Sequence, residues 1–229
     1  MLQACLNGDR TGPAVPVTAS EIAEDARRCV EEGAAELHVH PRDDESRDTL
    51  EPSRVAEVVE AVRAACPGVP LGVTTGLWAA GGGPSRRLAL ISEWTELPDY
   101  VSVNVAEPGF AELCGLLAAR GVGIEAGVWS VADAHDLIEA GSALLRALVE
   151  VGDGPDEPAR ALEISAALAG FDAPQLHHGE GRATWAIIEA AAARGHDIRI
   201  GLEDTWVLPD GSPARDNAQL VREAVRWKK

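Results

Sequence analysis

Short apolar runs alternate with longer stretches of helical periodicity along almost the whole chain. An apolar run over residues 2–6 precedes Thr18 and Glu21, which have the spacing of a capping box, and helical spacing then continues to Gly33. Glycine or proline marks each later junction. We predict strands over residues 2–6, 36–40, 71–74, 100–105, 123–129, 144–151, 175–178 and 197–202. After the first helix, we predict helices over residues 53–66, 85–94, 110–120, 131–140, 158–169, 182–194 and 216–227.

Eight strand–helix units in succession indicate the α/β fold class. A compact (β/α)8 TIM barrel accounts for this order, and a doubly wound open sheet is the alternative. The 229 residues, 46% of them hydrophobic, suffice for one well-buried domain and are too few for two. We therefore expect residues 1–229 to form a single catalytic domain. The glycine-rich stretch 81–84 would follow the third strand on the catalytic face, as a lid or as a flexible connection.

Composition removes several classes of partner. The formal net charge of −17 argues against nucleic acid and anionic membranes, because both are polyanions that proteins meet with clustered Lys and Arg. No apolar stretch approaches the roughly 18 residues of a membrane span, and no signal peptide is evident. The four cysteines form no Cys-x-x-Cys pair and are expected to be reduced. We expect a cytoplasmic protein.

Lysine occurs only at Lys228 and Lys229. A Schiff-base aldolase, a pyridoxal phosphate enzyme and a P-loop nucleotidase each need a positioned lysine, and a pair at the end of the chain is a poor candidate. Carbonyl chemistry in this protein would therefore need a metal.

His38 and His40 are the most informative candidate site, because they lie one residue apart at the end of a predicted strand. Alternate strand residues share a face, so both imidazoles can reach one metal ion. Paired histidines also occur on polar strand faces that bind no metal, so the pair alone leaves both readings open.

The last predicted strand adds a carboxylate. Its alternation places Ile198, Ile200 and Leu202 toward the helices and Arg199, Gly201 and Glu203 toward the barrel axis. Burying Arg199 and Glu203 is costly unless they bind a ligand or each other. Two histidines and Glu203 form a common catalytic zinc set, whereas an internal Arg199–Glu203 salt bridge is the alternative.

Further polar residues end the middle strands. Thr74 and Thr75 precede Gly76 at the end of the third strand, and Asn104 shares a face of the fourth strand with Ser102. Threonine is also a good strand former, so a purely structural role is an open alternative. His177 and His178 end the seventh strand, and one of them should face the axis, as a ligand, a substrate contact or a structural histidine.

Several motifs together resemble the β-keto acid cleavage enzyme family, which includes 3-keto-5-aminohexanoate cleavage enzyme. The resemblance spans nearly the whole chain, and its His-x-His and Arg-x-Gly-x-Glu-Asp strands are quite specific. The motifs are Ala4-Cys-Leu-Asn-Gly8, Gly33-Ala-Ala-Glu-Leu-His-Val-His-Pro-Arg-Asp43, Val73-Thr-Thr-Gly76, Ile198-Arg-Ile-Gly-Leu-Glu-Asp204 and Asn217-Ala-Gln-Leu-Val221.

The resemblance implies a (β/α)8 barrel enzyme that uses Zn²⁺ and acetyl-CoA. It would convert a β-keto acid into acetoacetate and a new acyl-CoA by retro-Claisen chemistry, and members are commonly homo-oligomers. It implies zinc ligation by His38, His40 and Glu203.

The same resemblance assigns roles around the metal. Asp204 would be the general base, oriented by Arg199, and zinc would stabilise the enolate charge. The substrate carboxylate would bind the hydroxyl and backbone groups of Thr74, Thr75 and Gly76.

Two positions depart from the family. Arg10, beside Asp9, stands where the member acting on an amino-bearing substrate has glutamate, so an anionic or polar substrate tail is expected unless Arg10 faces solvent. Glu107 stands where a small hydroxyl residue is usual and would change the charge of the pocket.

The loops around strands six and seven are also shorter than in typical members, where they help to shape the CoA side of the site. A zinc hydrolase or lyase that does not use CoA is the second candidate function. A non-catalytic barrel that binds a metal or a small acid is a third possibility. The sequence leaves open which acid is the substrate and which divalent ion is bound.

Overall fold

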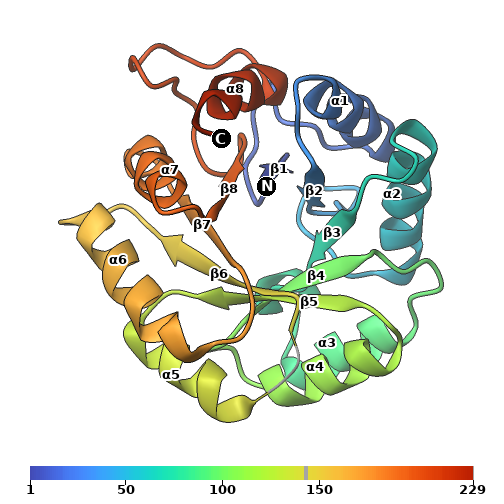
Figure 1. Cartoon of the computed structure of the whole chain (residues 1–229). Helices are drawn as coiled ribbons and strands as arrows, with labels where there is room; N and C mark the ends of the chain where they lie inside the picture. Colours follow the sequence, from blue (N-terminus) through green and yellow to red (C-terminus); the bar gives the residue numbers. More distant parts are fainter. Residues whose placement is uncertain (142–143, 229) are drawn as a thin grey trace.

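Eight parallel strands close into a barrel in the order β1 to β8, each followed by a helix on the outside (Figure 1). The computed structural model describes residues 1–141 and 144–228, so Lys229 lies outside the described residues. The strands are β1 (Leu2–Cys5), β2 (Glu36–Val39), β3 (Leu71–Thr74), β4 (Tyr100–Asn104), β5 (Gly123–Val128), β6 (Arg146–Val151), β7 (Gln175–Gly179) and β8 (Asp197–Ile200). The fold is the predicted (β/α)8 barrel.

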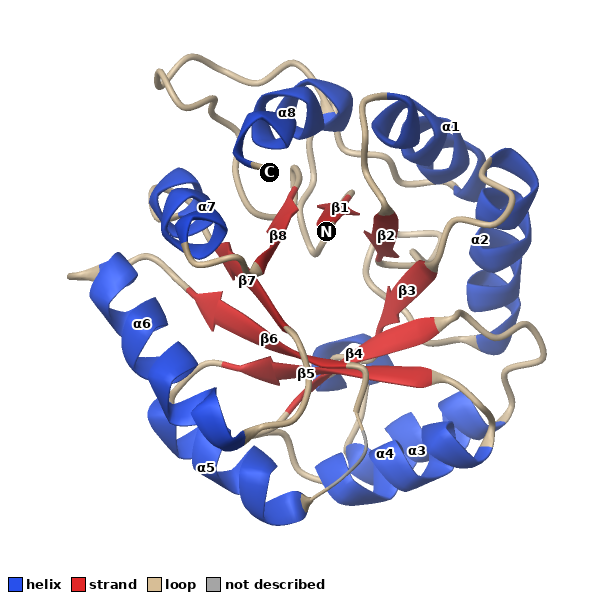
Figure 2. Cartoon of the chain, in the orientation of Figure 1, coloured by secondary structure: helices blue, strands red, loops and turns tan. Residues whose placement is uncertain are grey.

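The helices form an outer ring around the strands (Figure 2). They are α1 (Ala19–Glu31), α2 (Pro52–Ala65), α3 (Pro84–Ser92), α4 (Phe110–Ala119), α5 (Val131–Ala140), α6 (Glu157–Ala167), α7 (Thr184–Ala193) and α8 (Asn217–Ala224), with short 3-10 turns η1 (Leu77–Ala80), η2 (Leu168–Gly170) and η3 (Val225–Trp227). The predicted capping box is present, because the Thr18 side chain accepts from the Glu21 backbone and the Glu21 side chain accepts from the Thr18 backbone. In the described part of the chain, none of the helices combines the length and the apolar character that crossing a bilayer requires.

Polar side chains fill the barrel interior on the side away from the carboxyl ends of the strands. Gln3 Nε2 donates to Tyr100 Oη at 2.9 Å and to Glu125 Oε2 at 3.0 Å, and Arg146 Nε donates to the same Glu125 oxygen at 2.7 Å. Gly72 makes room for Tyr100, because a Cβ at residue 72 would lie 2.1 Å from the ring. These hydrogen bonds close the barrel beneath the layer of side chains that carries the candidate site.

The end of β8 differs from the prediction. The strand stops at Ile200, and residues 201–204 turn, with the amides of Asp204 and Thr205 donating to the Gly201 carbonyl at 2.9 and 3.0 Å. A Cβ at residue 201 would lie 1.6 Å from the Cys5 carbonyl oxygen, so only glycine lets the chain turn this close to β1. Glu203 therefore reaches the barrel mouth from a turn and not, as strand alternation predicted, from the strand.

Candidate active site

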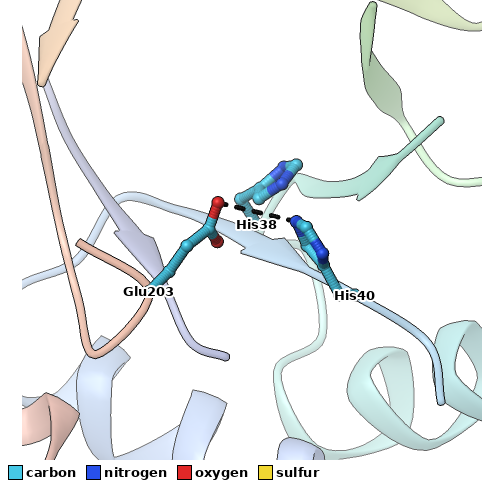
Figure 3. A group of neighbouring side chains, drawn as sticks. All are labelled: His38, His40 and Glu203. Atoms are coloured by element: carbon cyan, nitrogen blue, oxygen red, sulfur yellow. Dashed lines mark ion pairs between the residues drawn. The ribbon is translucent and has the colours of Figure 1, made fainter. Parts of the chain in front are cut away.

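The side chains of His38, His40 and Glu203 converge at the carboxyl ends of β2 and β8 (Figure 3). One ligand atom from each lies within 4.8 Å of the other two, and His40 Nε2 is 3.5 Å from Glu203 Oε1. The two imidazole rings meet edge to face, with centroids 5.3 Å apart. Among the described residues, this is the group of histidine, cysteine and carboxylate side chains that has the geometry to hold a metal ion.

Residues at the end of β1 hold this cluster in place. Asn7 Nδ2 donates to the His40 carbonyl at 2.8 Å, and the His40 amide donates to Asn7 Oδ1 at 2.9 Å. Gly8 has φ +53°, and a Cβ at this position would lie 2.4 Å from Glu203 Cγ. The Asn-Gly pair after β1 therefore fixes His40 and leaves space for Glu203.

Buried charges surround the cluster. Arg199 Nη2 forms an ion pair with Glu203 Oε1 and lies 3.4 Å from Asp204 Oδ1. Burial alone would raise the pKa of Glu203, but Arg199 and the two histidines outweigh it and hold that pKa well below its usual range. Burial lowers the pKa of His38, whereas the carboxylates of Glu203 and Asp48 overcome burial at His40 and raise its pKa to about 9.

The donor set fits a divalent cation. His38 Nδ1 and Glu203 Oε2 are buried and have no hydrogen-bond partner among the described residues. They are two of the ten buried side-chain nitrogen and oxygen atoms in the described part of the chain that lack such a partner, so the chemistry of the three donors, and not the missing hydrogen bonds, indicates the ion. Two imidazoles and one carboxylate are a common catalytic zinc set that leaves a coordination position open.

Asp48 lies behind His40 and contacts three side chains. Its Oδ2 atom is 2.7 Å from His40 Nδ1 and accepts from Trp78 Nε1 at 2.9 Å, and its Oδ1 atom is 3.1 Å from Arg42 Nη1. The Asp48 carboxylate is 2% exposed. Asp48 was not predicted from the sequence, because its loop between β2 and α2 has no periodicity that would indicate the direction of the side chain.

His178 of β7 faces the barrel axis between two carboxylates. Its Nε2 atom is 2.8 Å from Glu150 Oε2, and its Nδ1 atom is 3.1 Å from Asp204 Oδ1. Burial and Arg199 lower the pKa of His178, but Asp204 and Glu150 prevail and raise it to about 10. Asp204 is 1% exposed and also accepts from the Cys5 thiol at 2.9 Å. One histidine of the pair faces the axis, as predicted.

A cavity of about 700 Å³ opens above the cluster. Of the predicted site residues, it is lined by Arg10, His38, His40, Thr74, Gly76, Asn104, Arg199 and Glu203. Arg10 is half-buried and its Nε donates to the Glu203 carbonyl at 3.2 Å, so Arg10 does not simply point to solvent.

Three predicted residues lie outside the cavity wall: Thr75, Glu107 and Asp204. The Thr75 hydroxyl donates to the Ser102 carbonyl at 2.6 Å, so it binds backbone. Glu107 forms an ion pair with the buried Arg87 and accepts from Asn104 Nδ2 at 3.2 Å, so its charge is compensated within the protein. The expected change of pocket charge by Glu107 does not occur in this geometry.

The cavity wall also contains residues that were not predicted from the sequence: Trp78, Trp129, Glu150, Glu180 and Trp206. Glu150 had a usable signal, because it shares the inward face of β6 with Arg146 and Leu148 near the strand end. The tryptophans and Glu180 lie in or near loops, where strand periodicity gives no direction.

Comparison with known proteins identifies relatives. The model of a family described as beta-keto acid cleavage enzyme matches residues 1–151 and 175–229. A 3-keto-5-aminohexanoate cleavage enzyme of Fusobacterium nucleatum is 27% identical over 233 residues, covering 95% of this chain and 85% of the relative. A 3-oxoadipate:acetyl-CoA acetyltransferase of Cupriavidus necator is 42% identical over 67 residues, which are 29% of this chain and 24% of the relative.

A solved structure has the same fold. The apo structure of ObcA superposes with a TM-score of 0.74 at 19% identity and covers 95% of this chain. This chain spans 62% of the length of the ObcA chain. The unmatched residues 152–174 of the family comparison contain α6 and its flanking loops, between β6 and β7.

Proposed function

The chain belongs to the beta-keto acid cleavage enzyme family, and we propose that it is a zinc-dependent enzyme that converts a β-keto acid and acetyl-CoA into acetoacetate and a new acyl-CoA. The observation that carries the proposal is the cluster of His38, His40 and Glu203 at the barrel mouth. When bound to these three side chains, zinc supplies Lewis-acid stabilisation of negative charge on the keto oxygen of the substrate. The proposal specifies that the catalytic metal is zinc, and not merely that a metal ion binds at this site.

Asp204 is the proposed general base. It takes the proton from the carbon between the keto and carboxylate groups, and that carbon then attacks the acetyl thioester and releases CoA thiolate. The thiolate adds to the original keto carbon, and the carbon–carbon bond then breaks to release the acyl-CoA and the carbanion of acetoacetate, which takes back the proton held by Asp204. Every atom of the two substrates is thus found in the two products.

The surroundings of Asp204 support this role. Arg199 and His178, which both line the cavity, lie 3.4 and 3.1 Å from Asp204 Oδ1 and orient the carboxylate. Because Asp204 is 1% exposed, bulk water is largely excluded from it. The base therefore works at the edge of the cavity, behind Arg199 and His178.

The substrate carboxylate is proposed to bind near Thr74 and Gly76. Both line the cavity at the end of β3, and the Gly76 amide donates to Thr74 Oγ1 at 3.2 Å. Thr75 contributes by holding the strand end to Ser102, and Asn104 contacts the substrate from β4.

Arg10 is proposed to receive an anionic or polar substrate tail. With Nε bonded to the Glu203 carbonyl, the outer guanidinium nitrogens have no hydrogen bond or ion pair among the described residues. A planar guanidinium suits a carboxylate through two parallel hydrogen bonds. The name of the Cupriavidus relative, 3-oxoadipate:acetyl-CoA acetyltransferase, denotes a keto acid with a second carboxylate, which supports this substrate class.

The unmatched residues 152–174 are the specific observation that favours a second candidate, a zinc hydrolase or lyase that does not use CoA. The leading proposal includes three further points that rest on the sequence and the family. The whole chain acts as one catalytic domain, the protein is cytoplasmic, and it assembles as a homo-oligomer.

Turnover of the zinc-loaded protein tests the proposal. The protein is incubated with β-keto acids that carry anionic, neutral or cationic tails, with and without acetyl-CoA, and acetoacetate and acyl-CoA are quantified. We expect both products only when acetyl-CoA is present, and most with an anionic tail. Absence of acetoacetate with every acid would overturn the proposal, and cleavage without acetyl-CoA would favour the second candidate.

A further inference from the structure

We propose that Asp48 is a positioning residue that sets the tautomer of His40 for metal binding. This inference rests on the proposed metal centre and deepens it. Asp48 Oδ2 lies 2.7 Å from His40 Nδ1, and Nε2 of the same ring is the nitrogen nearer Glu203, at 3.5 Å from Oε1. A carboxylate accepts a hydrogen bond and cannot donate one, so it places the proton on Nδ1. A cation that displaces the proton of Nε2 then binds the lone pair of that nitrogen.

Asp48 is itself held in this orientation. Arg42 Nη1 lies 3.1 Å from Oδ1, and the Arg42 side chain is 3% exposed. Trp78 Nε1 donates to Oδ2 at 2.9 Å, from η1 after the neighbouring strand. Oδ2 thus accepts a hydrogen bond and Oδ1 has an ion-pair partner, from two separate segments, and these contacts fix the side of the carboxylate that faces His40.

The arrangement predicts a specific effect of an amide. In Asp48→Asn, the buried Arg42 guanidinium only donates, so the amide oxygen will lie toward Arg42. The competing donor, Trp78, is 54% exposed and can bond to water instead. The amide NH2 then faces His40 Nδ1 and donates to it. This places the ring proton on Nε2, where it blocks metal binding.

Alanine has a different effect. Asp48→Ala removes the acceptor but adds no donor, so His40 can adopt either tautomer. Loss of one negative charge is the same in both variants. The order of the two zinc affinities therefore distinguishes three explanations. Tautomer control predicts weaker zinc binding by Asp48→Asn, and simple electrostatic attraction predicts equal losses of affinity in both variants. A packing role predicts weaker binding by Asp48→Ala.

Zinc affinity of the metal-free protein provides the test, measured with zinc alone by competition with a chromophoric chelator at fixed pH. We expect Asp48→Asn to weaken zinc binding by about 10–100-fold, with a smaller loss in Asp48→Ala. Asp44→Asn removes the same charge from the same loop at an 84% exposed side chain and should bind zinc within about twofold of the unchanged protein.

Each outcome decides the inference. Normal zinc binding by Asp48→Asn, or a loss in Asp48→Ala as large or larger, would overturn tautomer control while leaving the proposed function intact. Failure of the unchanged protein to bind zinc would overturn both. If Asp48→Asn does not fold, Asp48→Glu carries the test, because it restores an acceptor and must bind zinc more tightly than Asp48→Ala.

Discussion

His177 and His178 are adjacent in β7, yet His178 lies between Glu150 and Asp204 in the barrel interior whereas His177 stacks on His196 outside it, with ring centroids 4.6 Å apart. The two environments shift the pKa in opposite directions. The carboxylates raise the pKa of His178 to about 10 against the effect of burial, and burial with the nearby His196 lowers the pKa of His177 to about 3.

These shifts predict opposite pH dependences of stability. An unfolded histidine titrates near 6.5, so the stabilisation from protonated His178 is complete below that pH and is lost as the pH rises toward 10. His177 stays neutral in the folded state, so its contribution is lost as the pH falls from about 6.5 toward 3.

The measurement compares urea unfolding of the chelator-treated protein with His178→Gln and His177→Gln across this pH range. The stability difference between the unchanged protein and His178→Gln should fall with rising pH, by up to about 1.4 kcal/mol per pH unit above pH 6.5. The difference from His177→Gln should rise with pH below 6.5. If both stability differences rose with pH, or if both fell, the pKa values of the two histidines could not be shifted in opposite directions.

Glu203 and Asp204 are neighbours with different predicted roles, and their amide variants should separate them. Glu203→Gln replaces a metal ligand and should weaken zinc binding by at least about tenfold. Asp204→Asn keeps the three donors and should retain zinc while losing turnover by about 100-fold or more. Zinc stoichiometry and acetoacetate formation are measured for each variant. Equal loss of zinc in both would show that the roles are wrongly assigned.

Arg10→Glu should change the preferred substrate. The substitution replaces a cation in the cavity wall by an anion, so acids with anionic tails should lose kcat/KM by about tenfold or more relative to neutral ones. Arg47→Glu makes the same charge change at a side chain that is 71% exposed, and it should leave the order of substrates unchanged. An unchanged order in Arg10→Glu would mean that the substrate tail does not reach this residue.

The sequence predicted those parts of the molecule that local patterns determine. The Thr18–Glu21 capping box, the eight strand–helix units and the shared face of His38 and His40 follow from spacing alone, and both ends of every strand were predicted within two residues. Glu203 was correctly grouped with the two histidines, but it was expected to continue the alternation of the strand. It instead follows a turn at Gly201, which brings the chain against the carbonyl of Cys5 in another strand.

Contacts between distant segments were not predictable in this way. Asp48 approaches His40 only because its loop folds back, and Glu107 is compensated by Arg87 from a different unit. No spacing rule links these pairs. The family resemblance identified the residue types of the site, but the structure was needed to find that Asp204 lies behind the cavity wall.

Gly201 makes the turn that carries Glu203, so Gly201→Ala should be strongly destabilising. The added Cβ would lie 1.6 Å from the Cys5 carbonyl oxygen, which belongs to backbone and cannot rotate away. We expect a loss of more than about 4 kcal/mol in unfolding free energy, and loss of zinc binding in any protein that still folds. Gly115→Ala is the matched control, because nothing lies within 4 Å of its added Cβ and it is in α4. That variant should gain about 1 kcal/mol from helix propensity. Urea unfolding measures both, and a Gly201→Ala protein as stable as Gly115→Ala would contradict the close contact between β8 and β1.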